Sequence, residues 1–433
     1  MKKINYKLRT ASFAILSGLF FLTSCNKELE QLPAIATPTY PTGLGVAARI
    51  ASNPNDSLFS RLIIRSGMTA TLNDLTKSFT IFAVDNVGMR LFATAASGGL
   101  VPAGAPDAVV SGFIANSLPV ASAAAIVQYN TIGQKFTAGT FGTAFPNYPL
   151  ASQIILDPTQ PFVRMPIFPV RGTPFSYVNN IPITSVDSVA ANGIIHHTFT
   201  IVSPLPAQPL TTLKTLINAD ANLTYFRAAI TRADSGQVGI SGVGAFGLAF
   251  DSLMNYPITN MTVLAPNNAA FQTLVFGLAY RGYLSTRPTP YTAIDSATAL
   301  ATANGAVAAG PAFLGTNNVT TATIRGILAY HILASKNTGS YKPDIRAFSV
   351  NFSSAAGGAF VNTLVNGSVA IHPGIMAQAT FTGPSVTALK FTGMGTFPPG
   401  GAPFSGGAAN ATSWDKISLN GVLHVIDKVL LPQ

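Results

Sequence analysis

The chain carries an internal duplication, and this limits its fold more than its composition does. Three segments recur in the same order in the two halves, each pair separated by roughly 180 to 230 residues. The pairs are TIFAVDNVGM (80–89) with TVLAPNNAAF (262–271), IVQYNTIG (126–133) with ILAYHILA (327–334), and NGIIHHTFTIVSP (192–204) with NGVLHVIDKVLLP (420–432). Solenoid repeats are only about 20 to 50 residues long, so this spacing predicts two duplicated domains.

The length agrees with this interpretation. A chain of 433 residues holds two or three domains of roughly 150 residues each. The second copy has extra residues before and after its middle segment, at roughly 280–320 and 393–410, and we expect these to be surface loops. The predicted organisation is a signal peptide (1–24), a tether (25–44), a first domain (45–205) and a second domain with loop insertions (206–433).

Composition argues against a nucleic-acid partner. Charged residues make up only 9% of the chain and hydrophobic residues 48%, so the surface must be polar without being ionic. Four of the 25 basic residues, Lys2, Lys3, Lys7 and Arg9, belong to the leader, and no basic run or basic–aromatic stripe follows. A surface that tracks phosphates is therefore not predicted.

The leader predicts export. Its basic start is followed by an apolar stretch, ASFAILSGLFFL (11–22), which is too short to span a bilayer. The sequence Leu-Thr-Ser-Cys then ends at Cys25 and resembles a bacterial lipobox, whose cysteine is acylated and becomes the new N-terminus. The alternative is an ordinary signal peptide with an incidental cysteine. Since Cys25 is the only cysteine in the chain, we favour lipidation, and intramolecular disulfides are excluded.

Acyl chains on Cys25 would hold the protein on a membrane, because two or more chains anchor stably. Asn26 stands where lipoproteins retained in the inner membrane tend to carry Asp, and Lys27-Glu28 resembles a signal of some surface lipoproteins. We therefore expect a lipid-anchored protein of the outer membrane, exposed on the cell surface or facing the periplasm.

Each copy predicts a strand that runs directly into a capped helix. Residues 262–264 are β-prone and apolar, Pro266 ends the strand, and the Asn267 side chain can accept a hydrogen bond from the first helical turn. Asp85 has the same place in the first copy. The middle segment of the second copy has apolar residues at helical spacing around His331, and the closing segment reads as a final strand.

Each copy is similar to a fasciclin domain. TVLAPNNAAF resembles the first conserved segment of that family, ILAYHILA its Tyr-His segment and NGVLHVIDKVLLP its closing segment. The first copy departs from the pattern: Val84 replaces the proline, and Asn130 replaces the histidine. The resemblance implies an α+β fold of two fasciclin-like modules in tandem, each a twisted β-sandwich or wedge flanked by short helices.

The candidate binding residues are Tyr330 and His331, because the family's Tyr-His segment has been implicated in adhesion. A histidine on an apolar helix face is more often a hydrogen-bonded core residue, and we favour that interpretation for His331. His196 and His197 are adjacent, so on a strand they point to opposite faces and do not jointly chelate an ion. No metal-binding or nucleophile motif occurs, and we predict no catalytic residue, metal or cofactor.

The function we expect is non-enzymatic: a surface lipoprotein that adheres to extracellular protein or carbohydrate. Two modules on one chain raise the effective concentration for a multivalent partner. One alternative is an accessory glycan-binding lipoprotein of a polysaccharide-capture system, which predicts aromatic platforms. Another class, a hydrolytic enzyme, requires a cluster of acidic or histidine side chains, and the 15 acidic residues are spread singly.

Overall fold

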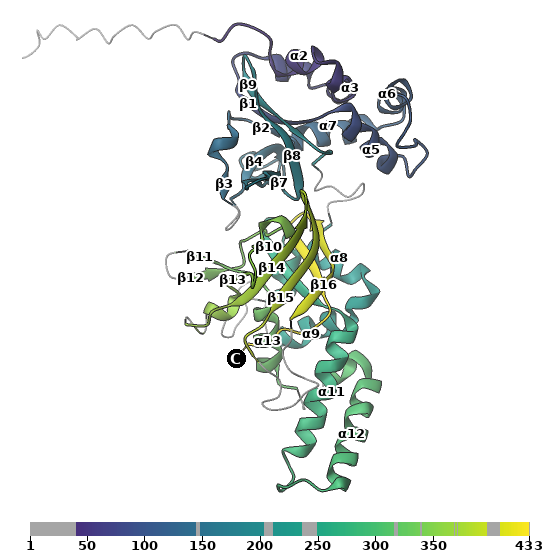
Figure 1. The fold of residues 1–433 in the computed structure, drawn as a ribbon, viewed down its shortest axis with the longest axis vertical. Coiled ribbons are helices and arrows are strands. Elements are labelled where there is room, and N and C mark those ends of the chain that lie inside the picture. Colours follow the sequence, from purple (N-terminus) through teal and green to yellow (C-terminus); the bar gives the residue numbers. More distant parts are fainter. Residues whose placement is uncertain are drawn as a thin grey trace, which may run out of the picture. The chain divides into compact units, whose positions relative to one another are not determined.

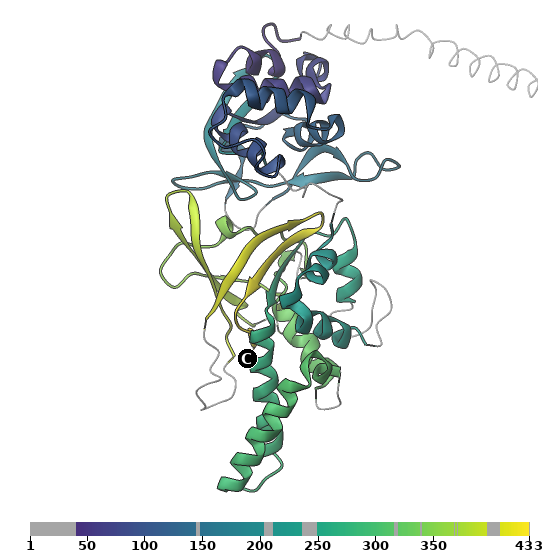
Figure 2. The ribbon, with the colours of Figure 1, turned by 90° about the vertical axis from the view of Figure 1, so that its right-hand side faces the viewer.

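The computed structural model describes residues 40–143, 148–202, 211–235, 249–315, 319–337, 340–367, 369, 371–395 and 408–432. They form a mixed α and β structure (Figures 1 and 2), and Thr42–Gln433 group into one compact unit. The predicted signal peptide, Cys25 and the predicted boundary near residue 205 lie outside the described residues.

The first half begins with helices and continues with strands. Its helical elements are α2 (Val46–Ala51), η1 (Pro54–Asp56), α3 (Ser57–Ser66), α4 (Thr69–Asn73), α5 (Asn86–Ala96), α6 (Asp107–Asn116), α7 (Val120–Tyr129) and η2 (Ala138–Thr140). Its strands are β1 (Phe79–Val84), β2 (Thr131–Ile132), β3 (Gly142–Thr143), β4 (Leu150–Ile155), β5 (Arg164–Ile167), β6 (Pro169–Arg171), β7 (Tyr177–Val178), β8 (Ile181–Ala190) and β9 (Gly193–Thr198).

The second half repeats this order with additions. Its helical elements are α8 (Leu213–Ala219), η3 (Ala221–Leu223), α9 (Thr224–Ala233), α10 (Phe250–Asn255), α11 (Asn268–Leu284), α12 (Ala293–Ala308), η4 (Gly310–Gly315), α13 (Thr321–Tyr330), η5 (Ser349–Asn351) and η6 (Leu364–Gly367). Its strands are β10 (Met261–Pro266), β11 (Ser335–Asn337), β12 (Ser340–Lys342), β13 (Ala359–Val361), β14 (Ile375–Thr382), β15 (Ser385–Thr392), β16 (Ala409–Ser418) and β17 (Gly421–Ile426).

In each half, the first and last strands pair in parallel. The sheet order is β3-β6-β7-β8-β9-β1-β2-β4-β5 in the first half and β10-β17-β16-β15-β14-β13 in the second. Phe79 lies opposite Gly193 in the first pair, and Met261 lies opposite Gly421 in the second. The closing segment of each copy thus returns beside its opening segment, and β17 confirms the predicted final strand.

The strand-to-capped-helix prediction is confirmed in both copies. Asp85 accepts a hydrogen bond from the N–H of Gly88 at 2.8 Å and caps α5. Asn267 accepts one from the N–H of Ala270 at 2.9 Å and caps α11. Either side chain satisfies a donor that the first helical turn leaves without a partner.

The two faces of β1 enter different apolar clusters, as alternation along a strand requires. Ile81 and Ala83 pack with the helices α2, α3, α5, α6 and α7. Phe82 packs on the other face with Tyr129 and with residues of the later strands. The second half has one large core formed by its helices and both ends of its sheet.

The prediction that residues 280–320 form a surface loop is wrong. The described part of this insertion is mainly helical: α11 continues to Leu284, and α12 lies beside it (Figures 1 and 2). Thr292 and Asp295 form a reciprocal capping box at the start of α12, and Ala299 and Ala303 are buried along it. Alanine has the highest helix propensity, so small residues build this helix without a wide apolar stripe.

Residues of both halves meet in a further apolar cluster inside the compact unit. Phe168 from the first half packs against Phe348 from the second, with ring centroids 5.9 Å apart. The guanidinium of Arg346 lies 5.2 Å from the Phe168 ring and donates to the carbonyl of Leu419 at 2.9 Å. Tyr177 donates from its hydroxyl to the carbonyl of Pro384 at 2.9 Å.

Among the helices that the structure describes, none is long and apolar enough by itself to cross a membrane. The consecutive helices α6 and α7 reach the length and hydropathy of a membrane span only when they are taken together, and a bend of 108° separates them.

Candidate functional site

A buried asparagine immediately precedes the closing strand of each half. Asn420 accepts a hydrogen bond from the N–H of Leu213 at 2.8 Å and donates to the carbonyls of Met254 and Tyr256 at 2.9 and 3.0 Å. Asn192 makes the equivalent contacts in the first half, accepting from one backbone N–H and donating to two carbonyls. Both side chains are fully buried. Each asparagine therefore ties the start of its last strand to the first helices of its half.

The glycine after each asparagine is required by close packing. A side-chain Cβ on Gly193 would lie 2.7 Å from the carbonyl oxygen of Phe79, and one on Gly421 would lie 2.5 Å from that of Met261. These oxygens belong to the parallel partner strands, so they cannot move without disturbing the sheet. The repeated Asn-Gly pair is thus a structural signature of the duplication.

A buried threonine bridges the same two places in each half. Thr80 donates to the carbonyl of Gln134 and accepts from the N–H of Phe136, both at 2.7 Å. Thr262 makes the equivalent two contacts in the second half: it donates to the carbonyl of Ile345 and accepts from the N–H of Ala347, both at 2.7 Å. One hydroxyl thereby satisfies a donor and an acceptor of a crossing segment.

One histidine in each closing strand has the same surroundings. His196 Nε2 lies 3.0 Å from the carbonyl of Phe136, and its Nδ1 accepts from the N–H of Asp187 at 3.2 Å. In the second half, His424 Nε2 lies 3.0 Å from the carbonyl of Ala347, and its Nδ1 accepts from the N–H of Asp415 at 3.3 Å. Nδ1 is the acceptor, so Nε2 carries the proton and both rings are neutral. Burial lowers the pKa of both.

His331 and Asn130 occupy equivalent places and make the same contacts. His331 Nδ1 lies 2.7 Å from the carbonyl of Ile327, and Nε2 accepts from the N–H of Leu430 at 2.9 Å. Asn130 donates to the carbonyl of Ile126 at 2.9 Å and accepts from the N–H of Val202 at 3.3 Å. Burial lowers the pKa of His331 to about 4, so this ring is neutral near pH 7.

The helix around His331 ends earlier than its apolar spacing suggested. α13 ends at Tyr330, and His331 is the residue that follows it. Ile332 leaves the helix because it pairs with Val263 of β10. The side chain of His331 nevertheless stays in the core, as we expected for a hydrogen-bonded histidine.

Tyr330 is also fully buried. Its hydroxyl donates to the carbonyl of Gly374 at 2.7 Å and accepts from the N–H of Met394 at 3.1 Å, and its ring meets His372 edge-on. Burial raises the Tyr330 pKa to about 12. Neither Tyr330 nor His331 presents its side chain to solvent. A contact role for the two residues stays a prediction, and a partner would have to act through the backbone around them.

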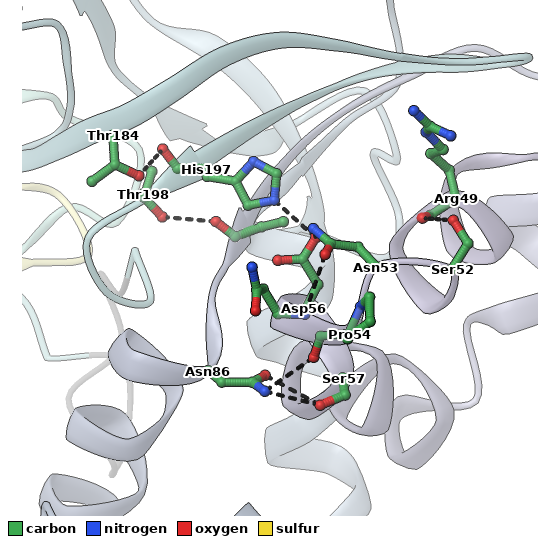
Figure 3. A network of polar contacts seen from close by, with 12 residues as sticks. Arg49, Ser52, Asn53, Pro54, Asp56, Ser57, Asn86, Thr184, His197 and Thr198 are labelled. Carbon is green, nitrogen blue, oxygen red and sulfur yellow. Dashed lines mark hydrogen bonds and ion pairs between the residues drawn. The ribbon is translucent and has the colours of Figure 1, made fainter.

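A contact between the half-buried His197 and the buried carboxylate of Asp56 distinguishes the first half from the second (Figure 3). His197 Nε2 lies 3.0 Å from Asp56 Oδ2, which also accepts from Asn53 Nδ2 at 2.8 Å. His197 lies on the face of β9 opposite to His196, as predicted. Within the described structure, Asp56 Oδ1 and His197 Nδ1 are buried without a hydrogen-bond partner. The equivalent residues of the second half are Leu223 and Val425, which are both buried and apolar.

The equivalence of these pairs allows a direct test. We expect Asp56→Leu and His197→Val each to lower the free energy of unfolding by about 1 to 3 kcal/mol, because each leaves a buried polar partner alone. The double variant, which copies the apolar pair of the second half, should cost less than the sum by about 1 to 2 kcal/mol. Urea unfolding measures all four proteins.

The surface pair Asp74 and Lys77, 3.3 Å apart, provides the matched control cycle. Its coupling should be near zero, since solvent-exposed ion pairs contribute little. A coupling at Asp56–His197 no larger than at Asp74–Lys77 would contradict the proposed pairing.

The structure does not bring the candidate residues into one reactive centre. Among the described residues, no three His, Cys, Asp or Glu side chains are placed to hold a metal ion. Sequence reasoning missed Asn192, Asn420 and the Asp56–His197 pair. The repeated Asn-Gly pair was a visible signal for the first two. No sequence signal pointed to the Asp56–His197 pair.

Solved structures, but no sequence comparison, give a likeness to this chain. No known protein family and no curated protein matches the sequence. Among solved structures, a FAS1 domain pair from the insect cell adhesion molecule fasciclin I is similar to this chain. Its sequence identity is 13%, the match covers 88% of this chain and 98% of that chain, and the TM-score is 0.30. The functional proposal is therefore argued from the chain's own residues.

Proposed function

We propose that this protein is a lipid-anchored, non-enzymatic adhesion protein of the cell surface that contacts extracellular protein or glycan. It would do so through two fasciclin-like modules, residues 45–205 and 206–433, each a twisted β-sandwich or wedge flanked by helices, of which α11 and α12 are 17 and 16 residues long. The observation that carries the proposal is the duplicated buried frame. The polar side chains of this frame make the same internal contacts in both halves, so they are not available to a substrate. They stabilise two copies of the same fold, and two copies on one chain suit a multivalent partner.

The frame explains the use of three of the five histidines. His196, His331 and His424 hydrogen-bond backbone groups in the interior, and burial lowers the pKa of each. A general acid or base works best when its pKa is near the working pH and it can reach a substrate. These histidines are better suited to fixing the backbone than to proton transfer.

A hydrolytic enzyme is the alternative of another class, and Asp234 is its strongest candidate. Burial raises the pKa of this carboxyl group. However, Asp234 accepts from the N–H groups of Phe250 and Asp251 at 2.9 and 2.7 Å, and Arg325 lies 3.8 Å away. These contacts hold the start of α10, so the structural role accounts for the residue.

Lipidation is tested at Cys25. The variant Cys25→Ser should incorporate no labelled palmitate and should remain unprocessed, because serine provides no thiolate for acylation. The matched variant Ser24→Ala keeps the cysteine and a small preceding residue, so it should still be labelled. Mass spectrometry of the N-terminus shows, for each protein, whether residue 25 is acylated and whether the leader has been removed. An unmodified wild-type N-terminus at another residue would refute the proposal.

Adhesion is tested with the full chain displayed on a bacterial host. Cells that express the wild type should be retained on surfaces coated with extracellular protein or polysaccharide. Cells that express Cys25→Ser should wash off, since the unprocessed, unacylated precursor has no lipid anchor with which to reach the cell surface. Surface exposure of the wild type is checked by antibody labelling. Equal retention of wild-type and empty cells at verified exposure would refute the adhesion proposal.

A further inference from the structure

A cleft of about 450 Å³ opens beside the apolar cluster that joins the two halves. Its first-half wall is the turn between β6 and β7, including Pro174 and Phe175. Its second-half wall is formed by the segment after η5, by β13 and by the end of β14. The volume lies within the range of about 300 to 1,000 Å³ that small-molecule sites occupy, which often lie where two substructures meet.

Aromatic residues from both halves line the cleft. Phe175 and Tyr177 come from the first half, and Phe352, Phe360 and Phe381 come from the second. The Phe360 side chain is 56% exposed, although it borders a cleft with other aromatic neighbours. An exposed phenylalanine at the mouth of such a cleft is suited to stacking against a ligand.

Contacts behind the cleft hold its walls in place. The Tyr177 hydroxyl donates to the carbonyl of Pro384 at 2.9 Å and so links the two walls. The Phe352 ring meets Phe391 edge-on at 5.3 Å, with an interplanar angle of 90°. A site whose walls are fixed before binding loses less conformational entropy when the ligand enters.

The polar groups of the cleft are uncharged. Its lining contains Thr173, Asn351, Ser353 and Ser354, and no Asp, Glu, Lys, Arg or His is among the lining residues. Thr173 and Ser354 are exposed at the rim. A charged ligand would lose hydration here without an opposite charge in return, so the chemistry favours a neutral ligand that offers both apolar faces and hydroxyl groups.

From these features we propose that the cleft binds a neutral oligosaccharide. A pyranose ring presents C–H groups to aromatic faces and hydroxyls around its edge to the rim, and both kinds of partner are present. An extended peptide fits less well, because the wall strand Ala359–Val361 is only three residues long and offers little edge for strand addition. This inference rests on the proposed function, and names the ligand class and the surface that binds it.

The test is calorimetric titration of the full chain with the neutral sugars maltohexaose, cellohexaose, mannohexaose and xylohexaose. At least one should bind saturably, and Phe360→Ala should weaken that binding about tenfold by removing the stacking ring. Phe360→Tyr keeps the ring and should bind like the wild type. Phe162→Ala is the matched control, because Phe162 is 78% exposed and does not line the cleft. Thermal midpoints verify that all variants fold.

Several results would overturn the inference. They are no saturable binding by any of the four sugars, equal binding by wild type and Phe360→Ala, or tighter binding of the acidic oligogalacturonate hexamer. Binding of an uncharged phenylalanine-rich hexapeptide in place of the sugars would also overturn it. Adhesion of displayed cells is measured in parallel. Sugar binding without adhesion refutes only the proposed function, whereas adhesion that is unchanged without sugar binding refutes only the oligosaccharide site.

Discussion

Asn420→Ala is expected to lower the free energy of unfolding of the second half by about 4 kcal/mol. The asparagine side chain is fully buried and takes part in hydrogen bonds with Leu213, Met254 and Tyr256, and also with Thr259 and Ser418. Alanine removes all of these contacts and leaves backbone N–H and C=O groups buried without partners. Each such group costs about 1 to 3 kcal/mol, which is why the loss exceeds that of an average substitution.

Urea unfolding followed by tryptophan fluorescence measures this effect. Trp414 is the only tryptophan in the chain and lies in β16, so its signal reports on the second half. Asn218→Ala is the matched control: Asn218 is exposed in α8, and its replacement should change stability by less than about 0.5 kcal/mol. A loss below about 1 kcal/mol for Asn420→Ala would show that the buried asparagine does not hold the closing strand.

The sequence predicted those features that depend on neighbouring residues. The capped helix after each opening strand follows from a β-prone run and a capping residue, Asp85 or Asn267, and in the second copy also from Pro266. Its consequences reach only three residues along the chain, so a single segment contains all of the information. The final strand β17 was predicted for the same reason, because its short run of β-branched and apolar residues is visible within the segment itself, and the structure buries all six residues of the strand.

The partners of buried polar groups could not be predicted. Asn420 and Leu213 are hydrogen-bonded although 207 positions separate them, and His331 and Leu430 are 99 positions apart. Nothing in the sequence around either residue indicates its partner. The Asp56–His197 contact spans 141 positions. Such pairs are set by how the sheet and helices pack, which local patterns do not encode.

The helix α12 escaped prediction for a different reason. Its sequence, AIDSATALATANGAVA, is dominated by small residues, and it lacks the broad apolar stripe by which an amphipathic helix is recognised. The capping box at Thr292 and Asp295 was a local signal for its start. High helix propensity and packing against α11 supply what the pattern lacks.

Acidification should destabilise the protein through His331. Burial lowers the folded pKa of this histidine from 6.5 to about 4. Below about pH 6.5 the unfolded chain therefore binds a proton at this histidine. The folded protein binds that proton only below about pH 4. Stability from this residue is complete above pH 6.5 and falls between pH 6.5 and 4, by about 3 kcal/mol at most. Burial also lowers the pKa of His196, His372 and His424, so the wild-type profile alone cannot isolate one residue.

The variant His331→Asn isolates this contribution. Asn130 already makes the equivalent two contacts in the first half, so the substitution should cost about 1 to 3 kcal/mol at pH 7.5. At pH 4.5 asparagine carries no proton penalty, and the variant should equal or exceed the wild type in urea unfolding. The other histidines and the carboxylates cancel in the difference between the two proteins.

A difference between wild type and variant that does not change with pH would show that His331 is not held neutral by burial. Adhesion of displayed cells, measured at pH 7.5, addresses the contact role of Tyr330 and His331. If His331 acts through folding alone, adhesion falls only as far as the folded fraction falls. A variant with the wild-type unfolding midpoint and strongly reduced adhesion would instead make the Tyr330-His331 segment a contact surface, reached through its backbone because both side chains are buried.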